Sequence, residues 1–212
     1  MIYIYNIIIY ILMSQCPNAK YQSPINLEKK FTLPVCQKMS IKGYNEGAIY
    51  NSNSKIFVVR DKVILKIDSK LYHLVEYHFH VAGEHTICKK EYPAEIHYVF
   101  FEMKHNNDFK TCNGQCVCDS STTIDETILV IGRVIRDTDQ YTDLTKLQVK
   151  IPSSYFEYDG TLTGQTITDM YTPVRWFVGE NSIKLPVDQI KEQTKTSKPI
   201  SSLDNRIILY SS

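Results

Sequence analysis

Apolar and polar residues alternate along several stretches of this chain, as they do in strands that bury one face. The two longest stretches are 70–81 (KLYHLVEYHFHV) and 94–103 (AEIHYVFFEM). Shorter apolar runs predict further strands at 55–60, 62–67, 128–135 and 174–178. The 15 tyrosines and the many β-branched residues favour the same interpretation, because both types fit a pleated, half-buried surface.

Helical signals are few and short. Residues 137–149 predict a helix with Asp137 or Thr138 as its N-cap, and residues 186–195 predict a second helix with a proline in its first turn. A polar segment, 104–126, forms a long connection between two of the expected strands. The order of elements therefore predicts an α+β, mainly β fold, with an antiparallel or mixed sheet and short helices at its edges.

Size and charge narrow the range of functions. The 212 residues suit one large domain or two small ones. The 24 basic and 23 acidic side chains leave a formal net charge of +1, so the chain lacks the basic balance typical of nucleic-acid-binding domains. The pattern also contains no basic amphipathic helix, which argues against a membrane surface as a partner. The oligomeric state stays open.

The N-terminal run 2–12 (IYIYNIIIYIL) has two interpretations. It is shorter than the roughly 20 residues that span a bilayer. It resembles the apolar part of a secretion signal, although no Lys or Arg precedes it and no A-x-A pattern follows. Alternatively, translation starts at Met13. We expect residues 1–13 to be an extension and residues 14–212 to form one domain, secreted in the first case and cytoplasmic in the second.

Six cysteines leave further alternatives open. An even number permits disulfides in an oxidising compartment, but a chain of this size can build a core without them. Cys112, Cys116 and Cys118 lie close together in the sequence. They predict either a loop with free or paired thiols or a site for a soft metal, and they lack the second Cys/His pair of a zinc finger.

Three histidines on the two longest expected strands give the strongest chemical signal. His78 and His80 are two residues apart, so their side chains share one face of a strand, about 7 Å apart. His97 follows 17 residues later on the next strand, after a connection that contains Gly83 and Pro93. When two such strands pair, three imidazoles can converge on one point. Three protein ligands with a fourth position open to water are typical of a catalytic zinc site.

Two carboxylates accompany these histidines. Glu76 precedes His78 by two residues and Glu95 precedes His97 by two, so each shares a face with its histidine. Metal-binding imidazoles need such acceptors, because a hydrogen bond from the second ring nitrogen fixes the tautomer and the ring orientation. From spacing alone, a metal site and a chance grouping of surface and core histidines both stay open.

Several segments resemble motifs of the alpha-class carbonic anhydrase family, in the order in which the family carries them. Residues 76–80 (EYHFH) resemble its Q-F-H-F-H strand, residues 84–86 (EHT) its S-E-H-T segment, and residues 92–97 (YPAEIH) its Y-A-A-E-L-H strand. The other matching segments are 22–27 (QSPINL), 158–163 (YDGTLT), 174–176 (VRW) and 205–206 (NR). The resemblance extends from about residue 16 to residue 210.

The resemblance implies a large, central, twisted and mostly antiparallel sheet of about ten strands with short peripheral helices. It implies that Zn2+, held by His78, His80 and His97, provides a hydroxide that attacks carbon dioxide and gives bicarbonate. Thr163 would orient that hydroxide and pass its own proton to Glu84. Besides the substrates, anions and sulfonamide-type inhibitors are the ligands to expect.

The same resemblance assigns supporting residues. Glu76 would hold His78, Glu95 would hold His97, and a backbone carbonyl near Asn205 would hold His80. The apolar wall where carbon dioxide rests would consist of Val99, Val130, Leu162, Val174 and Trp176.

Two positions depart from the family. Fast members carry a histidine partway up the cleft as a proton shuttle, and alignment through residues 51–58 gives Ser54 at that position. Serine does not titrate near neutral pH, so we expect proton transfer to depend on buffer, with His73 as a weak alternative shuttle. Glu76 replaces the usual glutamine and adds a negative charge beside the expected metal.

A second class of function competes with the enzyme. Carbonic anhydrase-related proteins can keep the fold, lose metal ligands and act in adhesion or recognition, so fold alone does not decide function. Here the three histidines are retained together with Glu84 and Thr163, which favours the zinc enzyme. Hydrolysis of activated esters is expected only as a side activity.

Overall fold

The computed structural model describes residues 21–103, 127–164 and 172–212. Its first seven strands are β1 (Asn26–Leu27), β2 (Thr32–Pro34), β3 (Met39–Lys42), β4 (Ile49–Asn51), β5 (Ile56–Val58), β6 (Ile64–Ile67) and β7 (Lys70–His80). The others are β8 (Thr86–Ile87), β9 (Ala94–Glu102), β10 (Ile128–Arg136), β11 (Tyr155–Thr161), β12 (Pro173–Lys184), β13 (Thr194–Lys195) and β14 (Ile208–Ser211). Helical structure in these residues is limited to the 3-10 turns η2 (Lys29–Phe31) and η3 (Leu144–Lys146) and the α-helix α3 (Val187–Lys191).

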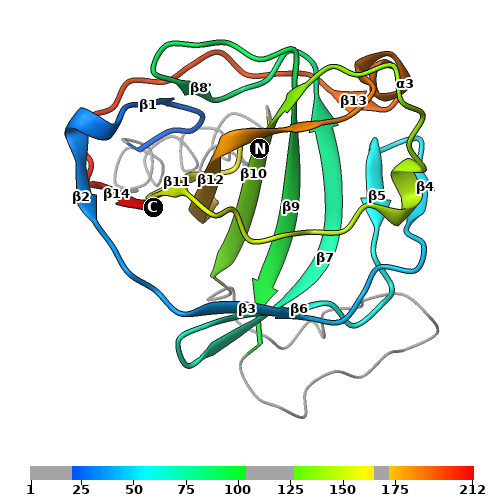
Figure 1. The fold of residues 1–212 in the computed structure, drawn as a ribbon, viewed down its shortest axis with the longest axis horizontal. Helices are drawn as coiled ribbons and strands as arrows, with labels where there is room; N and C mark the ends of the chain where they lie inside the picture. Colours follow the sequence, from blue (N-terminus) through cyan, green and yellow to red (C-terminus); the bar gives the residue numbers. More distant parts are fainter. Residues whose placement is uncertain (1–20, 104–126, 165–171) are drawn as a thin grey trace, which may run out of the picture.

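Twelve of these strands form one mixed sheet, in the order β2-β14-β11-β12-β10-β9-β7-β5-β4, with β3, β6 and β13 paired off this path. Most neighbours are antiparallel, while β10 with β12, β13 with β7 and β14 with β2 are parallel. Figure 1 shows β10, β9 and β7 side by side in the middle of the sheet. The expected fold, mainly β with short helices at the periphery, is confirmed.

Successive side chains of β7 point to opposite faces of the sheet. Tyr77 and Phe79 point into the larger apolar core, which also takes Ile96 and Phe100 from β9. The intervening residues of both strands point to the opposite face, where a smaller apolar cluster contains Val99, Val130, Trp176 and Val178. Each central strand is therefore buried on both faces, and only one of the two faces carries polar groups suited to chemistry.

The helix expected over 137–149 is wrong, because only Leu144–Lys146 is helical there. The side chain of Asp137 accepts a hydrogen bond from the backbone N–H of Val187, and the side chain of Asn45 donates to the carbonyl of Leu147. The side chain of Asn45 thus satisfies a backbone carbonyl that a helix would have paired, and the side chain of Asp137 caps another segment instead of a helix of its own.

The helix expected over 186–195 is shorter than predicted and ends at Lys191. Thr194 and Lys195 form β13 instead, which pairs with the end of β7. The strand expected over 174–178 is longer and covers Pro173–Lys184. No helix of the described ranges is long and apolar enough to cross a membrane. The expected boundary at residue 13 and the cysteines at 112, 116 and 118 lie outside the described residues, and Cys36 and Cys88 are free and exposed.

Candidate metal centre

Three buried histidines converge on one face of the sheet, as the strand pattern predicted. His78 and His97 are directly opposite each other in the β7–β9 pairing, and His80 lies two residues further along β7. The ring centroid of His78 lies 5.1 Å from that of His80 and 5.3 Å from that of His97. The ring centroids of His80 and His97 are 4.7 Å apart. One nitrogen from each ring lies within 4.8 Å of the other two. None of the three residues is more than 7% exposed.

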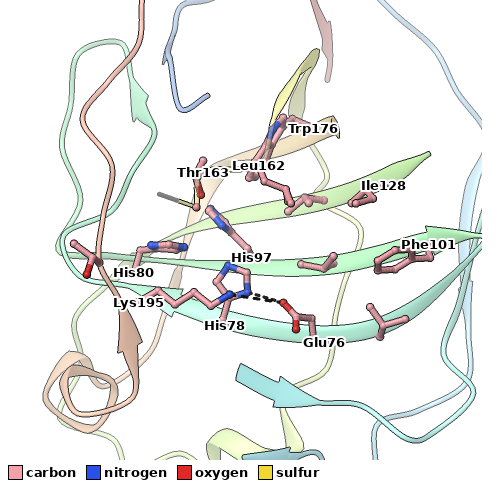
Figure 2. A pocket seen from close by; sticks show the side chains of 15 residues that line it. Glu76, His78, His80, His97, Phe101, Ile128, Leu162, Thr163, Trp176 and Lys195 are labelled. Atoms are coloured by element: carbon pink, nitrogen blue, oxygen red, sulfur yellow. Dashed lines mark hydrogen bonds and ion pairs between the residues drawn. The ribbon is translucent and has the colours of Figure 1, made fainter. Parts of the chain in front are cut away.

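Two carboxylates determine which ring nitrogens face the centre. Oε1 of Glu76 lies 3.2 Å from Nδ1 of His78, as Figure 2 shows, and Oε1 of Glu95 lies 3.0 Å from Nε2 of His97. A neutral imidazole that donates through one nitrogen offers the lone pair of the other. Nε2 of His78 and Nδ1 of His97 are therefore the nitrogens available to a metal ion.

Both ring nitrogens of His80 are buried and have no hydrogen-bond partner within the described part of the chain. Nδ1 of His80 lies 3.3 Å from Oε1 of Glu84. The acceptor that was expected near Asn205 is therefore not found among the described residues. A buried nitrogen without a partner is costly, and a cation between the three rings would supply that partner. Three imidazole donors of this kind fit a zinc ion.

Burial keeps the histidines neutral. It lowers the pKa of His78 to about 4 and also lowers the pKas of His80 and His97. Burial alone would raise the pKa of Glu95, but His85 and His97 hold that pKa well below its usual range. The centre therefore combines neutral imidazoles with an anionic carboxylate behind one of them, and neutral imidazole is the form that binds metal.

Glu84 and Thr163 lie beside the histidines and are 2% and 3% exposed. Burial raises the pKa of Glu84 to about 8, while the Thr163 hydroxyl and the backbone N–H of Lys198 act in the opposite direction. The N–H of Lys198 donates to Oε1 of Glu84 over 2.7 Å. Oε2 of Glu84 lies 3.9 Å from Nε2 of His97. A carboxylate and a hydroxyl thus accompany the histidine cluster.

The histidines open into a pocket of about 470 Å³ (Figure 2). Of the expected apolar wall, Val99, Val130, Leu162 and Trp176 line this pocket. Val174 does not line it, whereas Ile128, its partner in the β10–β12 pairing, does. Lining residues that the sequence did not indicate are Val75, Phe101, Ile128, Gly164, Lys195 and Thr196.

The comparison with known families agrees with this geometry. A model of eukaryotic-type carbonic anhydrases matches residues 11–205. The chain belongs to this family. Among carbonic anhydrases, that of Pectobacterium atrosepticum is 22% identical over an alignment of 210 residues, and the alignment covers 93% of this chain and 82% of the relative.

Solved carbonic anhydrases share the fold. The alpha-carbonic anhydrase of Thermovibrio ammonificans, in complex with sulfanilamide, has a TM-score of 0.65 at 18% identity over 93% of this chain and 89% of its own. A hyperthermostable carbonic anhydrase from an active hydrothermal vent chimney has a TM-score of 0.66 at 21% identity, over 95% and 91% of the two chains.

Neither Ser54, which stands at the position of the family's shuttle histidine, nor the alternative shuttle His73 lines the pocket of this carbonic anhydrase family member. Ser54 is exposed in the turn that follows β4. His73 lies on β7 but is only 3% exposed, and it is not among the lining residues. Within the described residues, the pocket therefore offers no titratable group at either position.

A buried polar network supports Glu95, and the sequence did not reveal it. Nδ1 of His85 lies 2.8 Å from Oε1 of Glu95, the oxygen that also contacts His97. Nε2 of His85 lies 2.6 Å from the hydroxyl of Tyr158, which in turn lies 3.1 Å from the hydroxyl of Ser23. These residues belong to the matching segments 22–27, 84–86 and 158–163, but nothing in their spacing shows that they meet.

Proposed function

We propose that this chain catalyses the reversible hydration of carbon dioxide to bicarbonate and a proton, with zinc held by His78, His80 and His97. The observation that carries the proposal is the convergence of three buried histidines in a pocket with an apolar wall. When bound, zinc acts as a Lewis acid that lowers the pKa of water from 15.7 to about 7, so an oxygen nucleophile exists at neutral pH.

The ligand roles follow from the hydrogen bonds. His78 would hold the ion through Nε2 because Glu76 faces Nδ1, and His97 would hold it through Nδ1 because Glu95 faces Nε2. His80 is expected to bind through Nε2, since Glu84 lies nearer to Nδ1. Carboxylate acceptors raise the basicity of imidazole ligands and hold the rings in one orientation.

Thr163 and Glu84 orient the nucleophile. An ionised Glu84 accepts a hydrogen bond from the hydroxyl of Thr163, so the hydroxyl oxygen is left to accept a hydrogen bond from the attacking oxygen. This fixes the lone pair that points at carbon dioxide, and the backbone N–H of Thr163 then holds bicarbonate. Burial raises the pKa of Glu84 to about 8, and a cation on the nearby histidines lowers it again by stabilising the carboxylate.

The apolar wall selects the substrate. Val99, Val130 and Trp176 present no charged group to the centre of the pocket. Carbon dioxide has no net dipole, so it loses little hydration when it rests against them. An apolar wall also excludes water, which strengthens the electrostatic effect of a cation on the reacting atoms.

One experiment tests the proposal directly. Zinc content and the rate of carbon dioxide hydration are measured for the native chain, for His97→Ala and for the control His73→Ala. We expect the native chain and His73→Ala to hold zinc and to be active, and His97→Ala to lose both properties. His73 is a suitable control because it is a buried histidine of the same strand pair that does not line the pocket.

A binding module is the competing function, and the same experiment separates it. A native chain that holds zinc but does not hydrate carbon dioxide would contradict the proposal and support the module. Sulfanilamide is a useful second probe, because a relative of the same fold binds it. We expect it to inhibit the native enzyme and to bind no longer once the zinc is removed.

A further inference from the structure

Lys195 enters the pocket from a strand that the sequence did not predict. In the parallel pairing of β13 with β7, Lys195 is the partner of the ligand His80 and Thr194 is the partner of Phe79. The side chain of Lys195 is 33% exposed and lines the pocket together with Thr196. Figure 2 shows this side chain extending toward His78 and Glu76.

The segment that carries Lys195 is fixed on both sides. Before it, the hydroxyl of Thr194 donates to the carbonyl of Lys191 over 3.3 Å. After it, the backbone N–H of Lys198 donates to the carboxylate of Glu84 over 2.7 Å. The hydrogen bond to Glu84 therefore holds the segment of Lys195 next to the histidines, because Glu84 lies beside them.

Apart from the histidines, the described lining of the pocket contains one acidic side chain, Glu76, and one basic side chain, Lys195. Nζ of Lys195 lies 3.9 Å from Oε1 of Glu76, whereas Nδ1 of His78 lies 3.2 Å from that same oxygen. A separation of 3.9 Å is too long for a hydrogen bond. The ion pair therefore leaves the ammonium N–H groups available to a ligand in the pocket.

We propose that Lys195 is a specificity-determining residue that binds anions in the pocket, bicarbonate among them. The negative charge of Glu76 lowers the affinity of Lys195 for these anions. This inference rests on the function proposed above. Bicarbonate carries a charge and carbon dioxide does not, so a cation at this position stabilises one bound species and leaves the other unaffected. A partly buried ammonium interacts more strongly with an anion than an exposed one, because it is less screened by water and salt.

The inference is tested on cobalt-substituted protein, in which anion binding is followed by visible absorption. The probes are thiocyanate and bicarbonate, and the variants are Lys195→Met, Lys195→Arg, Glu76→Gln and the control Lys66→Met. Lys66 is an exposed lysine of β6 that does not line the pocket, so its removal changes net charge alone.

We expect Lys195→Met to weaken the binding of both anions about fivefold, Lys195→Arg to retain it and Glu76→Gln to strengthen it. Lys66→Met should leave it unchanged, and the KM for carbon dioxide should be the same in Lys195→Met and the native enzyme. Equal anion affinity of Lys195→Met and the native protein would overturn the inference, as would an equal loss in Lys66→Met. A native chain that binds no metal or does not hydrate carbon dioxide would instead refute the proposed function.

Discussion

Oε1 of Glu95 lies 3.0 Å from Nε2 of His97, two residues along the same strand, and the pair is completely shielded from solvent. The backbone N–H groups of Glu84 and His85 donate to the other oxygen of Glu95 over 2.9 Å and 2.8 Å. The carboxylate therefore cannot turn away from His97 without breaking several hydrogen bonds. This arrangement makes Glu95 a positioning residue for the imidazole of His97.

Replacing Glu95 by glutamine should weaken zinc binding by about 10- to 100-fold, because the ligand His97 loses its charged acceptor. Competition with a chromophoric chelator measures this affinity. Glu102→Gln is the matched control, since Glu102 lies on the same strand but pairs with Lys70 at the surface. Equal affinities for Glu95→Gln and the native chain would show that the contact with His97 has no influence on the metal.

Removing the hydroxyl of Thr163 should lower kcat about 100-fold while zinc content stays unchanged. The reason is that Thr163→Ala leaves the attacking oxygen without an acceptor that fixes its orientation. Thr163→Ser keeps the hydroxyl and should retain most of the activity. The prediction fails when Thr163→Ala and Thr163→Ser hydrate carbon dioxide at similar rates.

Turnover of the native enzyme should rise with buffer concentration, because neither Ser54 nor His73 offers a titratable group in the pocket. Initial rates at constant pH and ionic strength, over a range of imidazole concentrations, measure this dependence. A native rate that is independent of buffer would indicate that another group transfers the proton.

As the pH falls from about 6.5 toward 4, the metal-free protein should lose the stability that its buried neutral histidines contribute. Glu84, whose pKa burial raises to about 8, changes stability in the opposite direction. The folded pKa of His78 is depressed to about 4, so its contribution is complete above the unfolded pKa of 6.5 and is lost on acidification. For this residue alone the loss is about 3 kcal/mol, and His80, His97 and His73 shift in the same direction.

Urea denaturation of chelator-treated protein at pH 7.5, 6 and 5 measures this effect. Zinc-loaded protein is the comparison at pH 7.5, where it should be the more stable form, because the ion binds the folded chain only. Metal-free Glu84→Gln lacks the opposing titration of Glu84, so unchanged midpoints of this variant between pH 7.5 and 5 would contradict the pKa directions of the buried histidines.

The metal centre was predictable because strand geometry is local and regular. Two-residue spacing fixed His78 and His80 on one face, and the antiparallel pairing of the next long strand brought His97 opposite His78. The same regularity predicted the contacts of Glu76 and Glu95 with their histidines. These features depend on one pairing between two long strands whose alternation is clear in the sequence.

The features that sequence did not reveal depend on contacts between distant segments. Lys195 was expected at the end of a helix, but pairing with β7 made it part of a strand beside His80. The residues of the carboxylate network are far apart in the chain, with Tyr158 following His85 by 73 residues. The absent helix over 137–149 has the same cause, since Asn45 and Val187 take up its polar groups.

The opposite orientation of neighbouring residues on β7 has a consequence for how such a protein can change over evolutionary time. Tyr77 and Phe79 pack into the main core, and His78 and His80 face the pocket. Loss of one histidine would remove a candidate metal ligand but leave the contacts of Tyr77 and Phe79 in that core in place. Inheritance of the fold and inheritance of the chemistry are therefore separable in this architecture, and descendants can retain the first long after mutation has ended the second.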